Sequence, residues 1–129
     1  PLKQGRSFRD TAGPVVASMF APGSGGPMVE LVREVALTTP VDTFCAAIEA
    51  IVNYDGLDNL RGIRVPTLLM AGQHDKVGRP EGMAQIQTRF VPHAELVVLP
   101  QSGHYAFAEE HALFNQHLLA FIHKHQPQA

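Results

Sequence analysis

The sequence lacks the features that mark disulfide-bonded, nucleic-acid-binding and membrane-associated proteins. Its single cysteine, Cys45, excludes an internal disulfide and is compatible with a reducing compartment. The formal net charge is −2, with both signs scattered along 129 residues, so nothing resembles a basic stripe for nucleic acid or a polybasic membrane anchor. No apolar run approaches the roughly 18 residues of a membrane span, and no signal peptide is visible. We therefore expect a cytoplasmic protein with neither nucleic-acid nor membrane partners.

The histidines also lack the spacing that zinc sites use. There is no His-x-x-x-His pair and no cysteine pair. His111 and His117 lie six residues apart, which places them on different faces of one predicted helix. His123 and His125 fall in the polar tail. We expect no metal ion and no other cofactor.

The N-terminal part of the chain predicts irregular structure followed by a helix. Prolines and glycines break any long period in residues 1–27, which leaves a short helix over 15–20 and an exposed loop over 21–27. Residues 28–38 then carry apolar side chains at i, i+3, i+4 and i+7, the stripe of an amphipathic helix. The stripe consists of Met28, Leu31, Val32 and Val35.

A second helix follows with clear signals at both ends. Thr39 is suited to the N-cap, Pro40 to the first helical position and Asp42 to the positive end of the helix dipole. The helix should end near residues 53–56. Its apolar face consists of Phe44, Ile48, Ile51 and Val52.

Two short apolar runs in the second half predict strands. A connector over 57–64 leads into the run 67–71, which has the continuous apolar character of a strand buried on both faces. Gly72 marks the turn that leaves this strand. Residues 95–99 form a second run of the same kind.

A helix follows each predicted strand. The first opens at Pro80 and stops before Pro92, because the residue before a proline disfavours helix. The second covers 107–123, with Glu109 and Glu110 in its first turn.

Strand, helix, strand, helix is the order of an α/β fold, with a parallel strand pair joined by a right-handed crossover. Two parallel strands do not make a stable sheet, because parallel sheets need cover on both faces and usually more strands. We therefore expect an incomplete sheet, whose neighbouring strands come from another polypeptide or from a part of the protein outside this sequence.

An acid and a histidine each come directly after a predicted strand. Asp75 follows the first strand and His104 the second, 29 residues later. The carboxyl ends of parallel strands share one edge of a sheet, which is where α/β proteins build their sites. Imidazole shuttles protons near neutral pH, and a carboxylate can fix its tautomer. Alternatively, Asp75 caps a turn and His104 is a structural loop residue.

The two segments resemble the C-terminal half of the α/β-hydrolase fold. Val65-Pro66-Thr67-Leu68-Leu69-Met70-Ala71-Gly72-x-x-Asp75 is similar to its penultimate strand and acid turn, and Leu99-Pro100-x-Ser102-Gly103-His104 to its histidine loop. The resemblance implies a helical cap segment over 1–56 and the C-terminal part of the core over 57–129. It also implies a hydrolase acting on a small apolar ester or lactone, with His104 as general base and then acid, and Asp75 orienting it.

The nucleophile of that family is missing, since no Gly-x-Ser-x-Gly elbow is present. Ser24 lacks the preceding strand and the first glycine of an elbow. Ser102 is better explained as a turn hydroxyl, and Cys45 as a small buried residue in a helix. We therefore expect the nucleophile to come from a missing N-terminal half or from a partner chain, with that half as a separate polypeptide partner, and this chain to be inactive alone.

Three alternatives stay open. An Asp nucleophile would give a dehalogenase or epoxide hydrolase, and relatives of this fold also cleave carbon–carbon bonds. In the second alternative the chain is a non-catalytic binding or receptor protein on the same scaffold. In the third it is a truncated domain without independent function. Whatever the chemistry, four apolar side chains are candidates for lining a substrate pocket. These are Val77, Tyr105, Phe107 and Phe44.

Overall fold

The two predicted strands pair at the centre of the C-terminal half of the protein. A computed structural model describes residues 8–126. Its elements, in chain order, are α1 (Phe8–Ser18), α2 (Pro27–Leu37), α3 (Val41–Asn53), α4 (Leu57–Leu60), β1 (Leu68–Gly72), α5 (Pro80–Arg89), β2 (Glu95–Leu99), α6 (Ala106–Glu109) and α7 (His111–His125).

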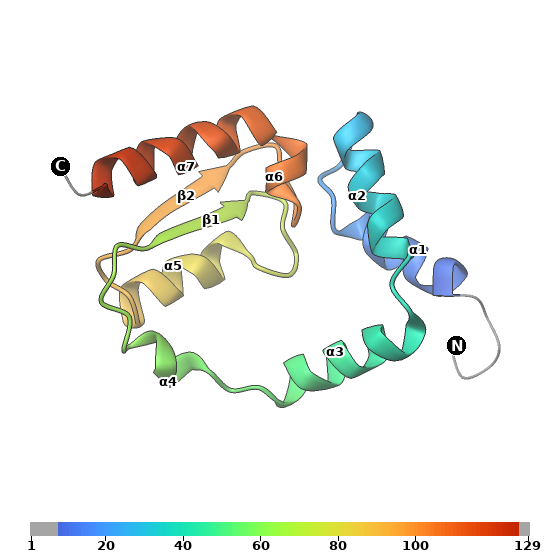
Figure 1. Cartoon of the computed structure of the whole chain (residues 1–129), viewed down its shortest axis with the longest axis horizontal. Helices are drawn as coiled ribbons and strands as arrows, with labels where there is room; N and C mark the ends of the chain where they lie inside the picture. The colour runs from blue at the N-terminus through green and yellow to red at the C-terminus, as the bar shows by residue number, and fades with distance from the viewer. Residues whose placement is uncertain (1–7, 127–129) are drawn as a thin grey trace.

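The sheet is parallel, as predicted. Leu68 pairs with Glu95 at one end of the ladder and Gly72 with Leu99 at the other. Helix α5 connects the strands and packs on one side of them, while α7 lies on the other side (Figure 1). The bounds of β2 match the prediction, and β1 lies one residue later than expected.

Burial of the strands on both faces was predicted and is wrong for the described residues. In β1 only Ala71 and Gly72 are buried, and in β2 only Leu99. The physical reason is that the described residues form a sheet of just these two strands, so each strand has an uncovered edge. The sheet is therefore incomplete, as the sequence indicated.

The N-terminal segment is helical where irregular structure was expected. Helix α1 starts at Phe8 and contains Pro14, so the prediction of a helix confined to 15–20 is wrong. Residues 1–7, also predicted irregular, lie outside the described residues. Ala12 and Val16 are both buried one helical turn apart, and this burial outweighs the cost of a proline inside the helix. The predicted exposed loop over 21–27 is confirmed as a loop over 21–26, with Ala21 buried, and Pro27 is already the first residue of α2.

Helix α2 matches its prediction to within one residue, but most of its apolar stripe is exposed, and only Val32 of the stripe packs against the core. Val29 is 1% exposed and packs with Val16 and Phe20, whereas Leu31 and Val35 are 57% and 60% exposed. The periodicity correctly predicted an amphipathic helix. It did not reveal that most of the stripe stays exposed among the described residues.

Helix α3 differs from its prediction at its start and in its burial. Pro40, not Thr39, occupies the capping position, and no side chain caps the helix. None of its residues is buried, and Cys45, expected to be buried, is exposed. In Figure 1, α3 stands away from the strands, which explains why its apolar face has little to pack against. Among residues 8–126 no single helix is long and apolar enough to cross a membrane; α2 and α3 meet that requirement only together, bent by 93°.

The predicted final helix is divided in two. Glu110 has φ −122° and ψ 49°, which separates α6 from α7. The carboxylates of Glu109 and Glu110 turn back to the loop after β2 instead of serving the start of one long helix. The connector over 57–64 also contains a one-turn helix, α4, that was not predicted.

Candidate active site

Asp75 and His104 meet at the carboxyl edge of the sheet. Asp75 lies three residues beyond β1 and His104 five residues beyond β2. The Nδ1 atom of His104 lies 3.0 Å from Oδ2 of Asp75, a hydrogen-bond distance. Parallel pairing therefore brings together the two residues that the sequence singled out.

The Asp75 carboxylate is almost buried and held from both sides. The backbone N–H groups of Val77 and Gly78 donate to its Oδ1 over 2.7 and 2.9 Å. Burial by itself would raise the pKa of Asp75, but the hydrogen bonds from His104, Val77 and Gly78 hold that pKa below its usual value. The group is therefore an anion in neutral solution and a fixed acceptor for the His104 Nδ1–H.

His104 presents its other ring nitrogen outward. Its side chain is 37% exposed, and no hydrogen bond to Nε2 comes from residues 8–126. The backbone N–H of His104 donates to the Met19 carbonyl oxygen over 2.7 Å. An imidazole whose Nδ1–H is bonded to a carboxylate has a basic Nε2, so this geometry suits proton transfer at Nε2.

The Asp75 interaction predicts a pH dependence of stability. A folded-state pKa below the unfolded value of about 3.9 means that the carboxylate stabilises the fold above that pH, and that this contribution is lost as pH falls through the lowered pKa. We expect the free energy of unfolding to decrease on acidification to about pH 3, and to decrease less in Asp75→Asn. Urea unfolding at several pH values measures this. Parallel curves for the two proteins would contradict it.

Two glycines allow close backbone contacts: Gly72 lets the end of β1 approach the histidine loop, and Gly103 lets the histidine loop approach the N-terminal loop. A Cβ at Gly72 would overlap the carbonyl oxygens of Gly103 and Ser102. A Cβ at Gly103 would overlap the Met19 carbonyl oxygen and lie 2.7 Å from the Ala21 nitrogen. All these neighbours are backbone atoms, so a side chain at either position would require the main chain to shift.

Gly103→Ala is therefore expected to destabilise the protein by about 1–3 kcal/mol. Gly82→Ala on α5 is the matched control, since nothing lies within 4 Å of its Cβ position, and alanine in a helix should be neutral or stabilising. Urea unfolding of both purified variants provides the comparison. Equal midpoints would show that the histidine loop does not pack as described.

None of the three side chains considered as an alternative nucleophile is available at the site. Ser24 and Ser102 are hydrogen-bonded elsewhere, and Cys45 lies outside the site. The Ser24 hydroxyl donates to Oε2 of Glu109. Ser102 is fully buried, and its hydroxyl donates to Oε2 of Glu110 over 2.6 Å. Cys45 lies on α3, outside the site. Both serines thus serve the loop structure, as the sequence indicated for Ser102.

Glu109 and Glu110 support the histidine loop, a role that sequence reasoning missed. They were placed only in the first turn of a helix, yet their carboxylates accept hydrogen bonds from the histidine loop itself. The one signal was their position five and six residues after His104. Local rules could not distinguish a carboxylate that caps its own helix from one that folds back.

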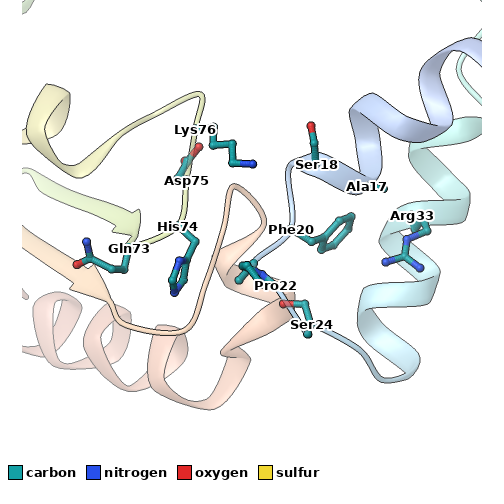
Figure 2. Close-up of a pocket in the computed structure, with 12 residues that line it drawn as sticks. Ala17, Ser18, Phe20, Pro22, Ser24, Arg33, Gln73, His74, Asp75 and Lys76 are labelled. Atoms are coloured by element: carbon teal, nitrogen blue, oxygen red, sulfur yellow. The ribbon is translucent and has the colours of Figure 1, made fainter.

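A hollow of about 560 Å³ lies behind the acid turn, between residues 73–76 and the segment 17–24. Figure 2 shows Asp75 and His74 leaving the turn in different directions, with Phe20 and Arg33 across the hollow. His104 is not among its lining residues. This hollow therefore lies on the acid side of the pair.

A second hollow, the apolar groove, lies between α2 and residues 105–107, directly after the histidine. Its volume is about 500 Å³ and its exposed lining is wholly apolar. Tyr105 and Phe107, both predicted to line a substrate pocket, form part of its wall, and the Tyr105 ring lies 5.5 Å from that of His104. The other lining residues come from α2: Met28, Leu31, Val32, Val35 and Ala36.

The two remaining pocket candidates do not line the apolar groove. Val77 is 61% exposed, and its backbone N–H holds Asp75. Phe44 lies half-buried on α3, apart from the strands. Neither residue is brought to the groove by the fold.

Comparisons of the sequence and of the structure with known proteins point to the same family. The sequence profile of the alpha/beta hydrolase fold matches residues 27–111. The chain is 32% identical over 75 residues to polyketide synthase ThaQ of Burkholderia thailandensis, covering 58% of this chain and 4% of that protein. It is 31% identical over 65 residues to the uncharacterized carboxylesterase nap of Bacillus subtilis, covering 50% and 22%.

Solved structures share the fold. An esterase from Exiguobacterium antarcticum superimposes with a TM-score of 0.79 at 23% identity, covering 93% of this chain and 44% of the esterase. The enol-lactonase from Burkholderia xenovorans superimposes with a TM-score of 0.79 at 22% identity, covering 92% and 46%. The chain thus spans less than half the length of each of these proteins, and aligns along nearly all of its own length.

Proposed function

Because this chain belongs to the α/β-hydrolase fold family, we propose that it contributes the acid and the histidine of a hydrolase active site, with the nucleophile on an N-terminal half outside this sequence, in the same polypeptide or in a partner chain. The observation that carries the proposal is the 3.0 Å contact between His104 Nδ1 and Asp75 Oδ2, with Asp75 Oδ1 held by two backbone N–H groups. The two uncovered edges of the sheet support it, because a partner that supplies strands would pair with them.

The chemistry follows from the orientation of the imidazole. His104 Nε2 takes the proton of the nucleophile as the nucleophile attacks an ester carbonyl, while Asp75 stabilises the imidazolium. The imidazolium then gives that proton to the departing alkoxide. In the second half-reaction His104 takes a proton from water, which attacks the acyl group, and returns it to the nucleophile.

The substrate that suits this site is a small apolar ester or lactone. The apolar groove begins at Tyr105, next to His104, and offers no charged or polar surface to a substrate. The esterase and lactonase names among the similar proteins agree with this class. The groove disfavours charged substrates, because burying an unpaired charge against apolar walls is costly.

The nucleophile can be identified directly. The protein is purified from its source under native conditions, its polypeptides are separated in denaturing solvent, and each is weighed by mass spectrometry and sequenced. We expect predicted strands and a Gly-x-Ser-x-Gly elbow, either N-terminal to this sequence in the same polypeptide or on a second polypeptide. An Asp at the elbow would redirect the function to a dehalogenase or epoxide hydrolase. Recovery of only the 129-residue chain, with no elbow in any polypeptide, would overturn the proposal.

Turnover of the assembled protein then tests the substrate class. Aryl esters of uncharged acyl groups should be hydrolysed continuously, and aryl esters of dicarboxylic acids, which carry a free carboxylate, poorly. Binding of these esters without turnover would favour the receptor alternative.

A further inference from the structure

We infer that Glu109 is a positioning residue for His104: its carboxylate fixes the histidine loop against the loop that follows α1. This inference rests on the proposed function, because it concerns the histidine that performs the proton transfer. It assigns a role to a side chain that touches neither a substrate nor the reacting atoms.

Glu109 accepts hydrogen bonds on both carboxylate oxygens. Oε1 receives the backbone N–H of Gly103 over 2.9 Å and that of Tyr105 over 3.3 Å. Oε2 receives the backbone N–H of Ala21 over 2.7 Å and the hydroxyl of Ser24. One half-buried side chain thus ties together two loops that are far apart in the sequence.

The residues bound by Oε1 are the two neighbours of His104. With the His104 N–H bonded to the Met19 carbonyl oxygen, three successive N–H groups of the histidine loop are fixed, at residues 103, 104 and 105. The backbone on either side of His104 therefore has little freedom to rotate. Fixing this backbone sets the direction of the Cα–Cβ bond and hence the distance from Nδ1 to Asp75.

The neighbouring Glu110 provides a matched control. Only its Oε2 accepts, from the Gln101 N–H over 2.9 Å and the Ser102 hydroxyl over 2.6 Å. A glutamine at 110 can place its amide oxygen at that position and retain both bonds. A glutamine at 109 cannot retain its set, because its NH₂ group must face backbone N–H donors: those of Gly103 and Tyr105 at one position, or that of Ala21 at the other.

The experiment compares Glu109→Gln with Glu110→Gln in the assembled hydrolase. Both variants lose one negative charge from adjacent positions. We expect kcat of Glu109→Gln to fall about 30- to 100-fold with KM little changed, since a shift of about 1 Å in a catalytic group costs this much. We expect Glu110→Gln to stay within about 3-fold of the unmodified protein.

A spectroscopic measurement gives a second readout that does not depend on turnover. Long-range ¹H–¹⁵N correlation NMR on the same samples reports which imidazole nitrogen of His104 carries the proton. The unmodified protein and Glu110→Gln should show a single form, protonated at Nδ1 and hydrogen-bonded. Glu109→Gln should show a mixture of tautomers or an exchange-broadened ring.

If Glu109→Gln fails to fold, Ser24→Ala replaces it, because that change removes one donor to Glu109 Oε2 and leaves the other three. It should lower kcat in the same direction by a smaller factor. An unchanged kcat and an unchanged His104 spectrum in the folded variant would overturn the inference. Absence of turnover in the unmodified protein would instead count against the proposed function, and the NMR comparison would still decide the role of Glu109.

Discussion

Replacing His104 by alanine is expected to lower kcat of the assembled hydrolase by about 10⁴- to 10⁶-fold. Within residues 8–126, His104 supplies the one imidazole in contact with the buried Asp75 carboxylate, and its Nε2, which receives no hydrogen bond from those residues, is its site for proton transfer. Without it the nucleophile keeps its proton and the leaving group is not protonated. The effect should appear in kcat, because the apolar groove is unchanged and KM depends on it.

His74→Ala is the control for this change. His74 is an exposed histidine adjacent to Asp75, and its backbone N–H bonds to the Ser102 carbonyl oxygen, which alanine retains. Its activity should stay close to that of the unmodified protein. Steady-state hydrolysis of an aryl ester measures both variants. If turnover persisted in His104→Ala, another residue would perform the proton transfer, and the assignment of the pair would be wrong.

Asp75→Asn is expected to lower kcat by about 10⁴-fold, the effect that loss of the acid has in other catalytic Asp–His pairs. The environment fixes the orientation of the new amide. Two backbone N–H groups point at the Oδ1 position, so the asparagine oxygen must remain there. Its NH₂ group then faces Nδ1 of His104, which must become an acceptor. The ring proton moves to Nε2, and the histidine can no longer accept a proton there.

The tautomer change separates this explanation from simple loss of charge. Asp58→Asn on α4 is the control, because its carboxylate is fully exposed and takes part only in a loose ion pair with Arg61. Activity assays should be combined with ¹H–¹⁵N NMR of the His104 ring. A large loss of kcat with Nδ1 still protonated would refute the orientation argument.

The parts of the fold that could be predicted from sequence are those set by neighbouring residues. The bounds of β2 followed from a short apolar run, and the start of α5 from Pro80. The pairing of Asp75 with His104 was also predictable, because both follow parallel strands and such strand ends share one edge. These inferences need no knowledge of what lies across the molecule.

The features that were missed depend on distant contacts. Pro14 argued against helix, yet buried contacts of Ala12 and Val16 keep α1 helical through it. The break at Glu110 arises because two carboxylates bind a loop that precedes them. The outward stripe of α2 was correctly predicted as apolar, but periodicity does not say whether another segment covers it.

The hydrogen bond from the Ala21 N–H to the Glu109 carboxylate joins residues 88 positions apart. Contacts of such large sequence separation form late, because closing a long loop costs entropy before any contact is gained. On the ribosome, α1 and the loop after it emerge long before Glu109 has been synthesised. In a nascent or partly folded chain, the hydrogen bonds from the two loops to Glu109 have therefore not yet formed. The geometry for proton transfer is completed at the end of folding.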